Sequence, residues 1–421
     1  MTPAPHERWP TKRVRFVTQR GPSDKHRRLL SRATQVTFLP MEAIGEQGEL
    51  DLSSVREIEE VNSGYTQFFD GDVVIAKITP CFENGKGALV SGTLGGVGFG
   101  TTELHVLTPG PDLDGRFLYF ITASPSFRQL GEASMTGAAG QKRVSEDFVR
   151  DFRIPVPQLA QQRAIADYLD RETARLDALA AAKERVLGLL AEKRRALITR
   201  AVTCGLDPSI PLRDSGIPWL GEIPAHWEIE RARWLFRERD QRSETGEEEL
   251  LTVSHLTGVT PRSEKDVNMF EAETTEGYKI CLSGDLVINT LWAWMGAMGV
   301  APMNGIVSPA YNVYQPGARL EPSYVDALVR MLIFAEEVTR YSKGVWSSRL
   351  RLYPEGFFDV FLPVPPLREQ CQIVSYIAKE TRKLDSLHSA TEQTISLLKG
   401  RRAALISAVV TGKIDVGSES A

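Results

Sequence analysis

An internal repeat is the feature that most constrains how this chain can fold. Residues 154–165 (IPVPQLAQQRAI) correspond to residues 362–373 (LPVPPLREQCQI), and the same offset holds without a gap as far as residues 207 and 415. The matched positions include Gln162 with Gln370, Tyr168 with Tyr376, Asp177 with Asp385 and Arg194 with Arg402. Composition alone does not produce this many identities at one offset. The two segments are therefore copies of one structural unit.

A weaker repeat lies upstream of each copy. The string GDVVI that begins at Gly71 resembles GDLVI at Gly284, and residues 102–106 resemble residues 309–313, each followed shortly by Pro-Gly. The chain is therefore ordered A–B–A′–B′, with two similar B segments and two diverged A segments. Such an order is typical of two different recognition functions carried on one scaffold.

Each B segment predicts one long helix. Its opening prolines suit an extended lead-in or a first helical turn, where a missing N–H costs nothing. About 45 residues without proline follow, with apolar side chains at helical steps of three, four and seven. The helices are expected to end near residues 203–205 and 411–412, and Lys183 and Thr391 interrupt the apolar stripe at matching places. The stripe consists of Ile165, Leu169, Leu176, Leu179, Val186, Leu190 and Leu197 in the first copy and Ile373, Ile377, Leu384, Leu387, Leu398 and Leu405 in the second.

The length of these helices predicts that they pair with each other. At about 1.5 Å per residue each spans roughly 65 Å, which is too long to bury its stripe in an ordinary globular core. A coiled coil would bury it, whereas the alternative is two unrelated helices flanking separate cores. Periodicity does not decide between a parallel and an antiparallel pairing of the two helices, but the duplication favours an antiparallel pair. The predicted coiled-coil and partner positions are Ile165, Leu169, Leu176, Leu190, Leu197, Ile373, Ile377, Leu384, Leu398 and Leu405.

The A segments predict mixed α/β domains with glycine-rich loops. Strands are expected at 73–78, 104–107, 286–289 and 311–314, and short helices at 117–121 and 324–334. Loops at 92–100, 137–140 and Gly344 lie between them, and loops on a rigid scaffold often carry function. The overall class is α+β.

Polar, basic and aromatic residues gather near these loops. Arg and Lys can read guanine, and Asn and Gln can read adenine, through paired hydrogen bonds in the DNA major groove. Each residue alone is also compatible with an ordinary solvated side chain. The candidate DNA-contacting residues are Lys77, Asn84, Lys86, Gln141, Lys142 and Arg143 in A, and Asn289, Trp292, Lys343, Trp346, Arg349 and Arg351 in A′, where Trp294 lies beside them.

The charge of the chain is uneven. The formal net charge of the 421 residues is −4, yet residues 1–35 hold nine Lys and Arg against Glu7 and Asp24. This basic stretch is either a solvated N-terminus or a phosphate-contacting surface, and the sequence leaves both open. The Pro- and Gly-rich segment 207–227 predicts a domain boundary.

The sequence lacks the motifs of several classes of function. The four cysteines form no C-x-x-C pair, which argues against a zinc site or a redox motif. No apolar run reaches the ~18 residues of a membrane span and no signal-peptide core is present, so a cytoplasmic protein is expected. The string at Ser308 (SPAY) lacks the second proline of an amino-methyltransferase loop, Asp72 with Lys77 lacks the intervening acid of a nuclease, and no Walker A string occurs. We therefore expect no catalysis and no cofactor bound by this chain.

Specific strings give the chain a resemblance to a known family. The lead-ins at 154–157 and 362–370, the segment 214–228 (DSGIPWLGEIPAHWE), and the strings 100–106 (GTTELHV) and 307–311 (VSPAY) carry it. Over essentially its whole length the chain resembles the specificity (S) subunit of type I restriction–modification systems. The basic N-terminal stretch is the one departure.

The resemblance implies an organisation of the chain. It implies two α/β target recognition domains, separated by two long antiparallel coiled-coil helices with an internal pseudo-two-fold repeat. The expected segments are target recognition domain 1 (1–155), a central conserved helical region (156–206), target recognition domain 2 with its N-terminal linker (207–362), a C-terminal conserved helical region (363–415) and a tail (416–421).

The resemblance also implies a function. Each domain would read one half of a bipartite, asymmetric site in double-stranded DNA, and the helices would set the spacer. The helical regions would dock two methyltransferase (M) subunits, which bind S-adenosylmethionine and methylate adenine. Two restriction (R) subunits, which use ATP and Mg, can join. The chain itself would do no chemistry.

Three other readings remain. The chain could be an S-like DNA-recognition subunit of a modification-only or other phage-defence complex, which neighbouring genes would reveal. A stand-alone DNA enzyme is disfavoured by the missing motifs, and binding of S-adenosylmethionine to the pure chain would test it. A coiled-coil structural protein is disfavoured by two diverged domains of ordinary size.

Overall fold

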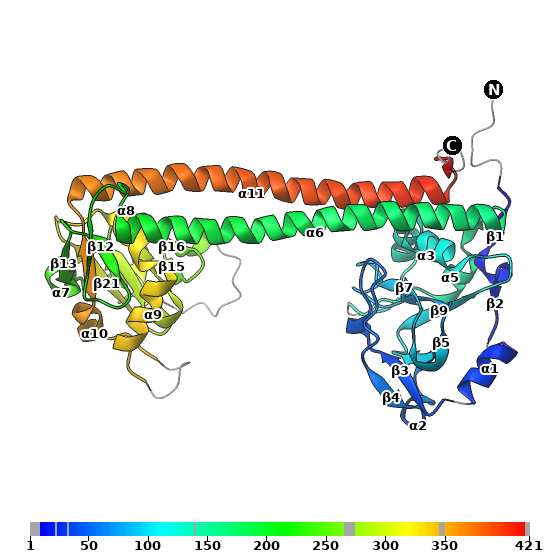
Figure 1. Ribbon diagram of the computed structural model, residues 1–421. Helices are drawn as coiled ribbons and strands as arrows, with labels where there is room; N and C mark the ends of the chain where they lie inside the picture. The colour runs from blue at the N-terminus through cyan, green and yellow to red at the C-terminus, as the bar shows by residue number, and fades with distance from the viewer. Residues whose placement is uncertain are drawn as a thin grey trace. The chain divides into compact units, whose positions relative to one another are not determined.

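A computed structural model describes residues 9–21, 23–31, 33–138, 140–264, 274–344 and 350–416. The chain forms two compact units, Met1–Glu184 with Glu392–Ala421 (unit 1) and Arg185–Thr391 (unit 2). Each unit combines one mixed domain with one part of both long helices, α6 (Leu159–Cys204) and α11 (Leu367–Val410) (Figure 1).

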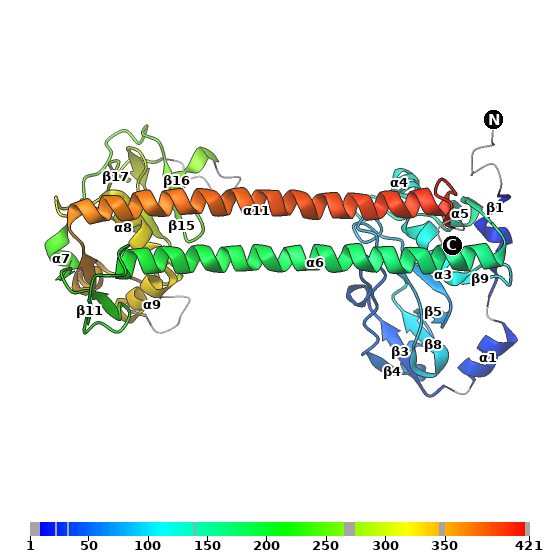
Figure 2. The same cartoon turned by 45° about the horizontal axis from the view of Figure 1, so that its top comes forward.

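The two long helices confirm the prediction made from the proline-free B segments. They contain 46 and 44 residues, and each is followed closely by a glycine at φ 73°, Gly205 and Gly412, which stops it. Within each unit, part of α6 runs beside part of α11 (Figures 1 and 2). The pairing is antiparallel. In unit 1 Asp177 meets Arg402 and Glu184 meets Lys399, whereas in unit 2 Arg194 meets Asp385.

Only part of the predicted apolar stripe is buried. All ten residues predicted for the coiled coil are buried or half-buried. Leu179, Val186 and Leu387, which we also placed on the stripe, are 45%, 37% and 55% exposed, so that part of the prediction is wrong. One partner helix covers only a narrow face of a helix with about 3.6 residues per turn, and a stripe with steps near 3.5 drifts off that face.

The ends of both helices are buried by the mixed domains, which the length argument did not anticipate. In unit 1, Ile165 and Leu169 of α6 join Ile406 and Val409 of α11 in the domain core. In unit 2, the core takes up the other ends of the two helices, including Val202 and Ile373. The helix pair is thus continuous with a globular core in each unit.

The unit 1 domain contains two four-stranded sheets and a short ribbon. One sheet has the order β2-β9-β6-β7 and is antiparallel, the other has the order β4-β3-β8-β5 with β3 and β8 parallel, and β1 pairs with β10. The elements are β1 (Thr11–Arg13), η2 (Val14–Phe16), β2 (Thr18–Gln19), α1 (Asp24–Leu30), β3 (Gln35–Leu39), η3 (Met41–Ala43), β4 (Val55–Glu57), α2 (Ile58–Val61), β5 (Thr66–Phe69), β6 (Val73–Ala76), β7 (Gly87–Leu89), η4 (Leu94–Gly96), β8 (Val97–Gly100), β9 (Leu104–Pro109), α3 (Gly115–Ala123), α4 (Pro125–Ala133), α5 (Glu146–Asp151) and β10 (Arg153–Pro155).

The unit 2 domain repeats this connectivity. Its four-stranded sheet has the order β14-β21-β18-β19, β13 pairs with β22, and the pairs β15–β16 and β17–β20 stand where unit 1 has β3–β4 and β5–β8. The elements are β11 (Leu212–Asp214), β12 (Glu222–Pro224), β13 (Glu228–Arg231), α7 (Ala232–Leu235), β14 (Phe236–Glu238), β15 (Leu251–Ser254), β16 (Gly258–Pro261), η5 (Arg262–Glu264), β17 (Lys279–Cys281), β18 (Leu286–Asn289), η6 (Ala293–Met295), β19 (Met298–Val300), β20 (Gly305–Val307), β21 (Tyr311–Pro316), α8 (Pro322–Val329), α9 (Leu332–Tyr341), α10 (Pro354–Asp359) and β22 (Phe361–Val364).

One predicted helix is wrong in its extent. The segment 324–334 was expected to be a single short helix, but α8 ends at Val329 and α9 begins at Leu332. Met331 between them has extended backbone angles (φ −70°, ψ 140°) and caps α9. The break turns the chain so that both helices bury apolar faces, including Leu328 and Phe334, in one core.

The repeat extends further upstream than the sequence analysis found. Trp9 packs against the glycine that ends α11, and Trp227 packs against the glycine that ends α6. The predicted linker 207–227 lies within unit 2, and three of its side chains, Leu220, Ile223 and Trp227, are buried in the core of that unit. From these tryptophans the chain enters equivalent strands, β1 and β13, which pair with β10 and β22.

Candidate nucleic-acid interface

Two segments that are distant in sequence meet at the end of β6 in unit 1. The N–H of Val144 donates to the carbonyl of Lys77 at 2.9 Å, and the N–H of Thr79 donates to the carbonyl of Lys142 at 2.9 Å. These bonds gather four of the predicted residues, Lys77, Gln141, Lys142 and Arg143, which we call the unit 1 corner.

A tight loop presents this corner. The backbones of Thr136 and Arg143 exchange two hydrogen bonds of 3.0 and 2.8 Å, which close the loop. Gly137 has φ +141°, and a Cβ there would lie 2.5 Å from the carbonyl oxygen of Gln141, so only glycine fits. Gln141 and Lys142 are exposed at this loop.

Glu103 holds the Arg143 side chain in one orientation. Arg143 Nε lies 2.9 Å from Glu103 Oε2, and Nη2 lies 2.8 Å from Oε1. Hydrogen bonding by Arg143 lowers the pKa of Glu103, and the same contact raises the pKa of Arg143. This two-point contact uses one edge of the guanidinium and leaves Nη1, and one N–H of Nη2, for a ligand.

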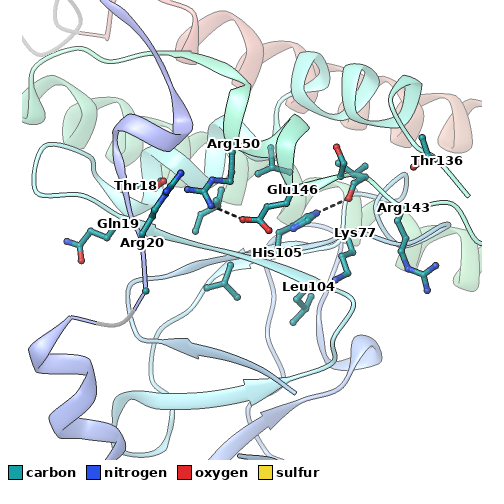
Figure 3. Close-up of a pocket in the computed structure, with 16 residues that line it drawn as sticks. Thr18, Gln19, Arg20, Lys77, Leu104, His105, Thr136, Arg143, Glu146 and Arg150 are labelled. Atoms are coloured by element: carbon teal, nitrogen blue, oxygen red, sulfur yellow. Dashed lines mark hydrogen bonds and ion pairs between the residues drawn. The ribbon is translucent and has the colours of Figure 1, made fainter. Parts of the chain in front are cut away.

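A hollow of about 730 Å³ adjoins the corner (Figure 3). Lys77 and Arg143 lie at one end of it and Arg20 and Arg150 at the other, where Arg150 binds Glu146 at 2.8 Å. Between them, Nε2 of His105 lies 2.9 Å from the carbonyl oxygen of Val144, which can only accept. Burial lowers the pKa of His105, so the ring is neutral near pH 7. The hollow is therefore lined by four cationic side chains, by the carboxylate of Glu146, and by a neutral imidazole whose Nε2–H is already bonded to the Val144 carbonyl.

The other two predicted residues of unit 1 lie on the turn between β6 and β7. Lys86 is half-buried, and its ammonium donates to the carbonyl of Met41 at 2.9 Å. Asn84 is exposed. The structure does not bring either into a hydrogen bond with the unit 1 corner, and their DNA contacts stay predictions.

Unit 2 builds an equivalent corner, in which Arg351 stands where unit 1 has Arg143 and the other side chains differ. The N–H of Leu352 donates to the carbonyl of Thr290 at 3.0 Å, as Val144 does to Lys77, and the backbones of Lys343 and Arg351 exchange two bonds of 2.9 Å. The structure thus brings together Thr290, Lys343 and Arg351. We call these residues, together with Trp292, the unit 2 corner.

The two predicted residues on the turn after β18 differ in exposure. Asn289 is 7% exposed, and its Oδ1 accepts a 3.3 Å bond from the N–H of Leu291, so its side chain holds the turn. Trp292 is 50% exposed and stacks on Trp294, with ring centroids 6.3 Å apart. Trp292 can therefore reach a ligand without rearrangement of the turn.

Trp346 and Arg349 lie outside the described residues. Sequence reasoning missed Glu103 and His105, and it covered Arg20 only as part of the basic stretch 1–35. The string GTTELHV already contains Glu103 and His105, but no local pattern shows that the start of β9 faces the loop that carries Arg143. In the part of the chain that the structure describes, no three His, Cys, Asp or Glu side chains gather as a metal site, and no helix is long and apolar enough to span a membrane.

Comparison with known proteins assigns a family to part of the chain. Residues 25–187 match the family model described as the type I restriction modification DNA specificity domain. These residues belong to that family. The match covers α1 to the middle of α6, which includes the whole unit 1 corner.

Relatives and solved structures agree with this family. The specificity subunits of the type I restriction enzymes EcoAI and EcoEI from Escherichia coli are 40% identical over 174 residues and 43% identical over 134 residues. These matches cover 38% and 31% of the chain but only 29% and 22% of the relatives. The HsdS subunit from Thermoanaerobacter tengcongensis shares the fold over 98% of both chains, with a TM-score of 0.58 at 19% identity. A chain from a study of complex assembly and conformational transition of the type I R-M system covers 98% of this chain and 99% of its own length, with a TM-score of 0.69 at 20% identity. The paired helices and mixed domains are thus the fold of type I specificity subunits.

Proposed function

We propose that this chain is the specificity subunit of a type I restriction–modification system and that it recognises a bipartite, asymmetric site in double-stranded DNA. One observation carries the proposal. The two units share three backbone hydrogen bonds at their corners, and each presents an arginine there, Arg143 or Arg351. The side chains beside the arginine differ, Lys77 in one unit and Thr290 with Trp292 in the other. One scaffold with two different reading surfaces suits two different half-sites.

The unit 1 corner suits readout of a base edge. Arg143 offers the outer edge of a guanidinium that Glu103 fixes in place, and Lys77 lies beside it. Arg20 in the adjoining hollow suits a phosphate, because phosphate contacts position a protein on DNA while base contacts give specificity. The formal net charge of −4 does not oppose this, because the cations needed are local.

The helices suit the role of a ruler and a platform. α6 and α11 pass from one unit to the other, so their length would set the spacer between half-sites. Exposed apolar residues on them, such as Leu189 (62%) and Leu397 (73%), suit docking of the methyltransferase subunits, of which we expect two. S-adenosylmethionine would be bound by those subunits, and ATP and Mg by restriction subunits where these join. The chain itself would be non-catalytic.

Co-expression with the neighbouring methyltransferase gene tests the proposal. Adenine methylation is mapped across the host DNA with and without this chain. We expect methylation at one split, asymmetric motif that requires the chain. A soluble methyltransferase that methylates nothing in its presence would refute the proposal and favour an S-like subunit of another phage-defence complex.

A further inference from the structure

Two large aromatic side chains are exposed at equivalent places in the two units. Phe16 in η2 is 71% exposed, and Trp234 in α7 is 75% exposed. Counted from Trp9 and Trp227, they occupy the same position of the upstream repeat. A single exposed aromatic needs no explanation, but its recurrence in two otherwise diverged domains does.

The surroundings of the two aromatics are repeated as well. Arg13 and Arg15 contact Asp151 at 3.2 and 2.8 Å, and Arg231 and Arg233 contact Asp359 in the same arrangement, with 3.4 Å for Arg231. Two guanidiniums against one carboxylate give each of these three-residue clusters a net charge of about +1.

The backbone that carries each aromatic is held in the same way. The N–H of Val14 donates to the carbonyl of Phe152 at 3.0 Å, and the N–H of Ala232 donates to the carbonyl of Val360 at 2.9 Å. Val14 and Ala232 are themselves buried. Each aromatic therefore stands on a fixed backbone, and little conformational entropy would be lost when it is buried by a partner.

Features that are kept in both units suit a ligand that is present twice. The half-sites of an asymmetric DNA site differ, and the corners that we assign to them differ accordingly. DNA backbone contacts would repeat the arginines but would not require an exposed aromatic. A protein that binds in two copies would meet the same aromatic and the same charge on each unit.

We propose that Phe16 and Trp234 are equivalent docking points for two copies of one partner protein, each copy receiving the aromatic in an apolar pocket with an acidic rim. This inference rests on the proposed function, in which that partner is the methyltransferase subunit. It adds a contact on each mixed domain to any contact on the long helices.

Native mass spectrometry of the co-expressed complex tests the inference. The full chain is purified with its methyltransferase, and the copies bound are counted for the wild type and for Phe16→Ser, Trp234→Ser and the double variant. At a chain concentration between the wild-type Kd and about thirty times that Kd, we expect mainly two copies on the wild type, one copy on each single variant and none on the double variant. Truncating a buried aromatic anchor should weaken binding of its own copy roughly thirtyfold.

Three control variants separate a lost contact from a misfolded chain. Phe16→Trp and Trp234→Phe, which install the other unit's aromatic, should keep two copies. Leu256→Ser should also keep two, although Leu256 is 74% exposed and lies in unit 2. Loss of a copy in any control would overturn the inference.

The remaining outcomes are distinguishable. Two copies bound to all serine variants would overturn the inference and leave the proposed function intact, whereas no copy bound to the wild type would overturn the function itself. Two copies with weakened binding of a DNA duplex would reassign the aromatics to DNA and overturn protein docking.

Discussion

Arg402 of α11 binds Asp177 of α6 at 2.9 Å in unit 1, and their repeat counterparts Arg194 and Asp385 form the same pair at 2.5 Å in unit 2. Each helix thus supplies the arginine once and the aspartate once, so the antiparallel pairing follows the two-fold relation of the repeat. The environments differ. The side chain of Arg402 is 14% exposed and also donates to the carbonyl of Gln47 at 3.4 Å, whereas that of Arg194 is 46% exposed.

Replacing the two arginines should therefore have unequal effects. Arg402→Ala removes the charged partner of the half-buried Asp177 and should lower the free energy of unfolding by about 2 kcal/mol. Arg194→Ala breaks an exposed pair and should cost about 0.5 kcal/mol or less. Urea unfolding of the full chain measures both. The double variant Arg402→Ala/Asp177→Ala should recover part of the loss, and equal losses for the two arginines would contradict this account.

Gln162 and Gln370 predict a second matched pair of effects. Oε1 of Gln162 accepts from the N–H of Asp114 at 2.8 Å, and its amide donates to the carbonyls of Asp112 and Pro157 at 2.9 Å. Gln370 makes the equivalent bonds to Glu321, Arg319 and Pro365, each at 2.8 Å. Both side chains are fully buried, and each ties the start of a long helix to the start of α3 or α8.

Gln162→Leu and Gln370→Leu should each lower the free energy of unfolding by about 3 kcal/mol, because several buried backbone groups lose their partners. Thermal melts and amide hydrogen exchange at Asp114 and Glu321 would measure the loss and locate it. Gln161→Leu is the control, since Gln161 is exposed and next to Gln162. A comparable loss in the control would mean that leucine, rather than the missing hydrogen bonds, destabilises the helix start.

The long helices could be predicted because their signal is local and long. Spacing of apolar residues, absence of proline and a terminal glycine sufficed to predict α6 and α11. The same spacing could not show that Leu179 and Leu387 are exposed, since that depends on how narrow a face the partner covers. The break between α8 and α9 was missed because neither Arg330 nor Met331 is a helix-breaking residue.

The residues of the candidate site that lie on one loop could be predicted from the sequence. Those that the fold brings together from distant segments could not. Residues 141–143 are adjacent in sequence, but Glu103 and Arg20 reach the same place through separate strands. The basic N-terminal stretch, whose role the sequence left open, is partly structural. Arg13 and Arg15 bind Asp151 in the same way as Arg231 and Arg233 bind Asp359. This part of the repeat has too few identical residues to be recognised in the sequence, and it becomes clear only once the equivalent strands β1 and β13 are known.

Arg143 and Arg351 should each serve one half-site. We expect Arg143→Ala to remove a guanine preference at one position of one half-site, and Arg351→Ala to weaken only the other half-site, each by about 1–3 kcal/mol of discrimination. Glu103→Gln should relax preference at the same base pair as Arg143→Ala, because Glu103 positions the guanidinium.

Methylation mapping of each variant, co-expressed with the methyltransferase, measures these preferences. Arg143→Lys is the matched control for charge, and it should keep affinity but lose the preference. An unchanged motif in Glu103→Gln would refute the positioning role. A uniform loss at both half-sites with a lower melting temperature would assign the arginines to the scaffold instead.

His105 should make the stability of unit 1 depend on pH. Burial lowers the pKa of His105 below its ordinary value of 6.5, and its bond to the Val144 carbonyl opposes the shift without cancelling it. As the pH falls, His105 is therefore protonated near pH 6.5 in the unfolded chain but only at a lower pH in the folded chain. The free energy of unfolding should fall as pH drops below this value.

His105→Gln keeps a donor for the Val144 carbonyl and cannot titrate. The difference in unfolding free energy between wild type and variant should be constant above pH 6.5. Below that pH the unfolding free energy of the wild type should fall relative to that of the variant. Lys77 and Glu146, which also act on His105, are present in both proteins. Parallel curves throughout would show that His105 is protonated as readily in the folded chain as in the unfolded one.

The helix pair should act as a ruler for the DNA spacer. Deleting residues 181–187 from α6 together with residues 393–399 from α11 removes matched heptads and keeps the Asp177–Arg402 and Arg194–Asp385 pairs in register. Each helix shortens by about 10 Å at 1.5 Å per residue, which corresponds to about three base pairs at 3.4 Å each. Methylation mapping should then show both half-sites unchanged and a shorter spacer between them. Removing only one of the two heptads is the control, because it breaks the register of the helix pair. It should abolish methylation both at sites with the original spacer and at sites with the shorter one. Altered half-sites with the original spacer would refute the ruler, since the helices would then act on the reading corners rather than on the distance between them.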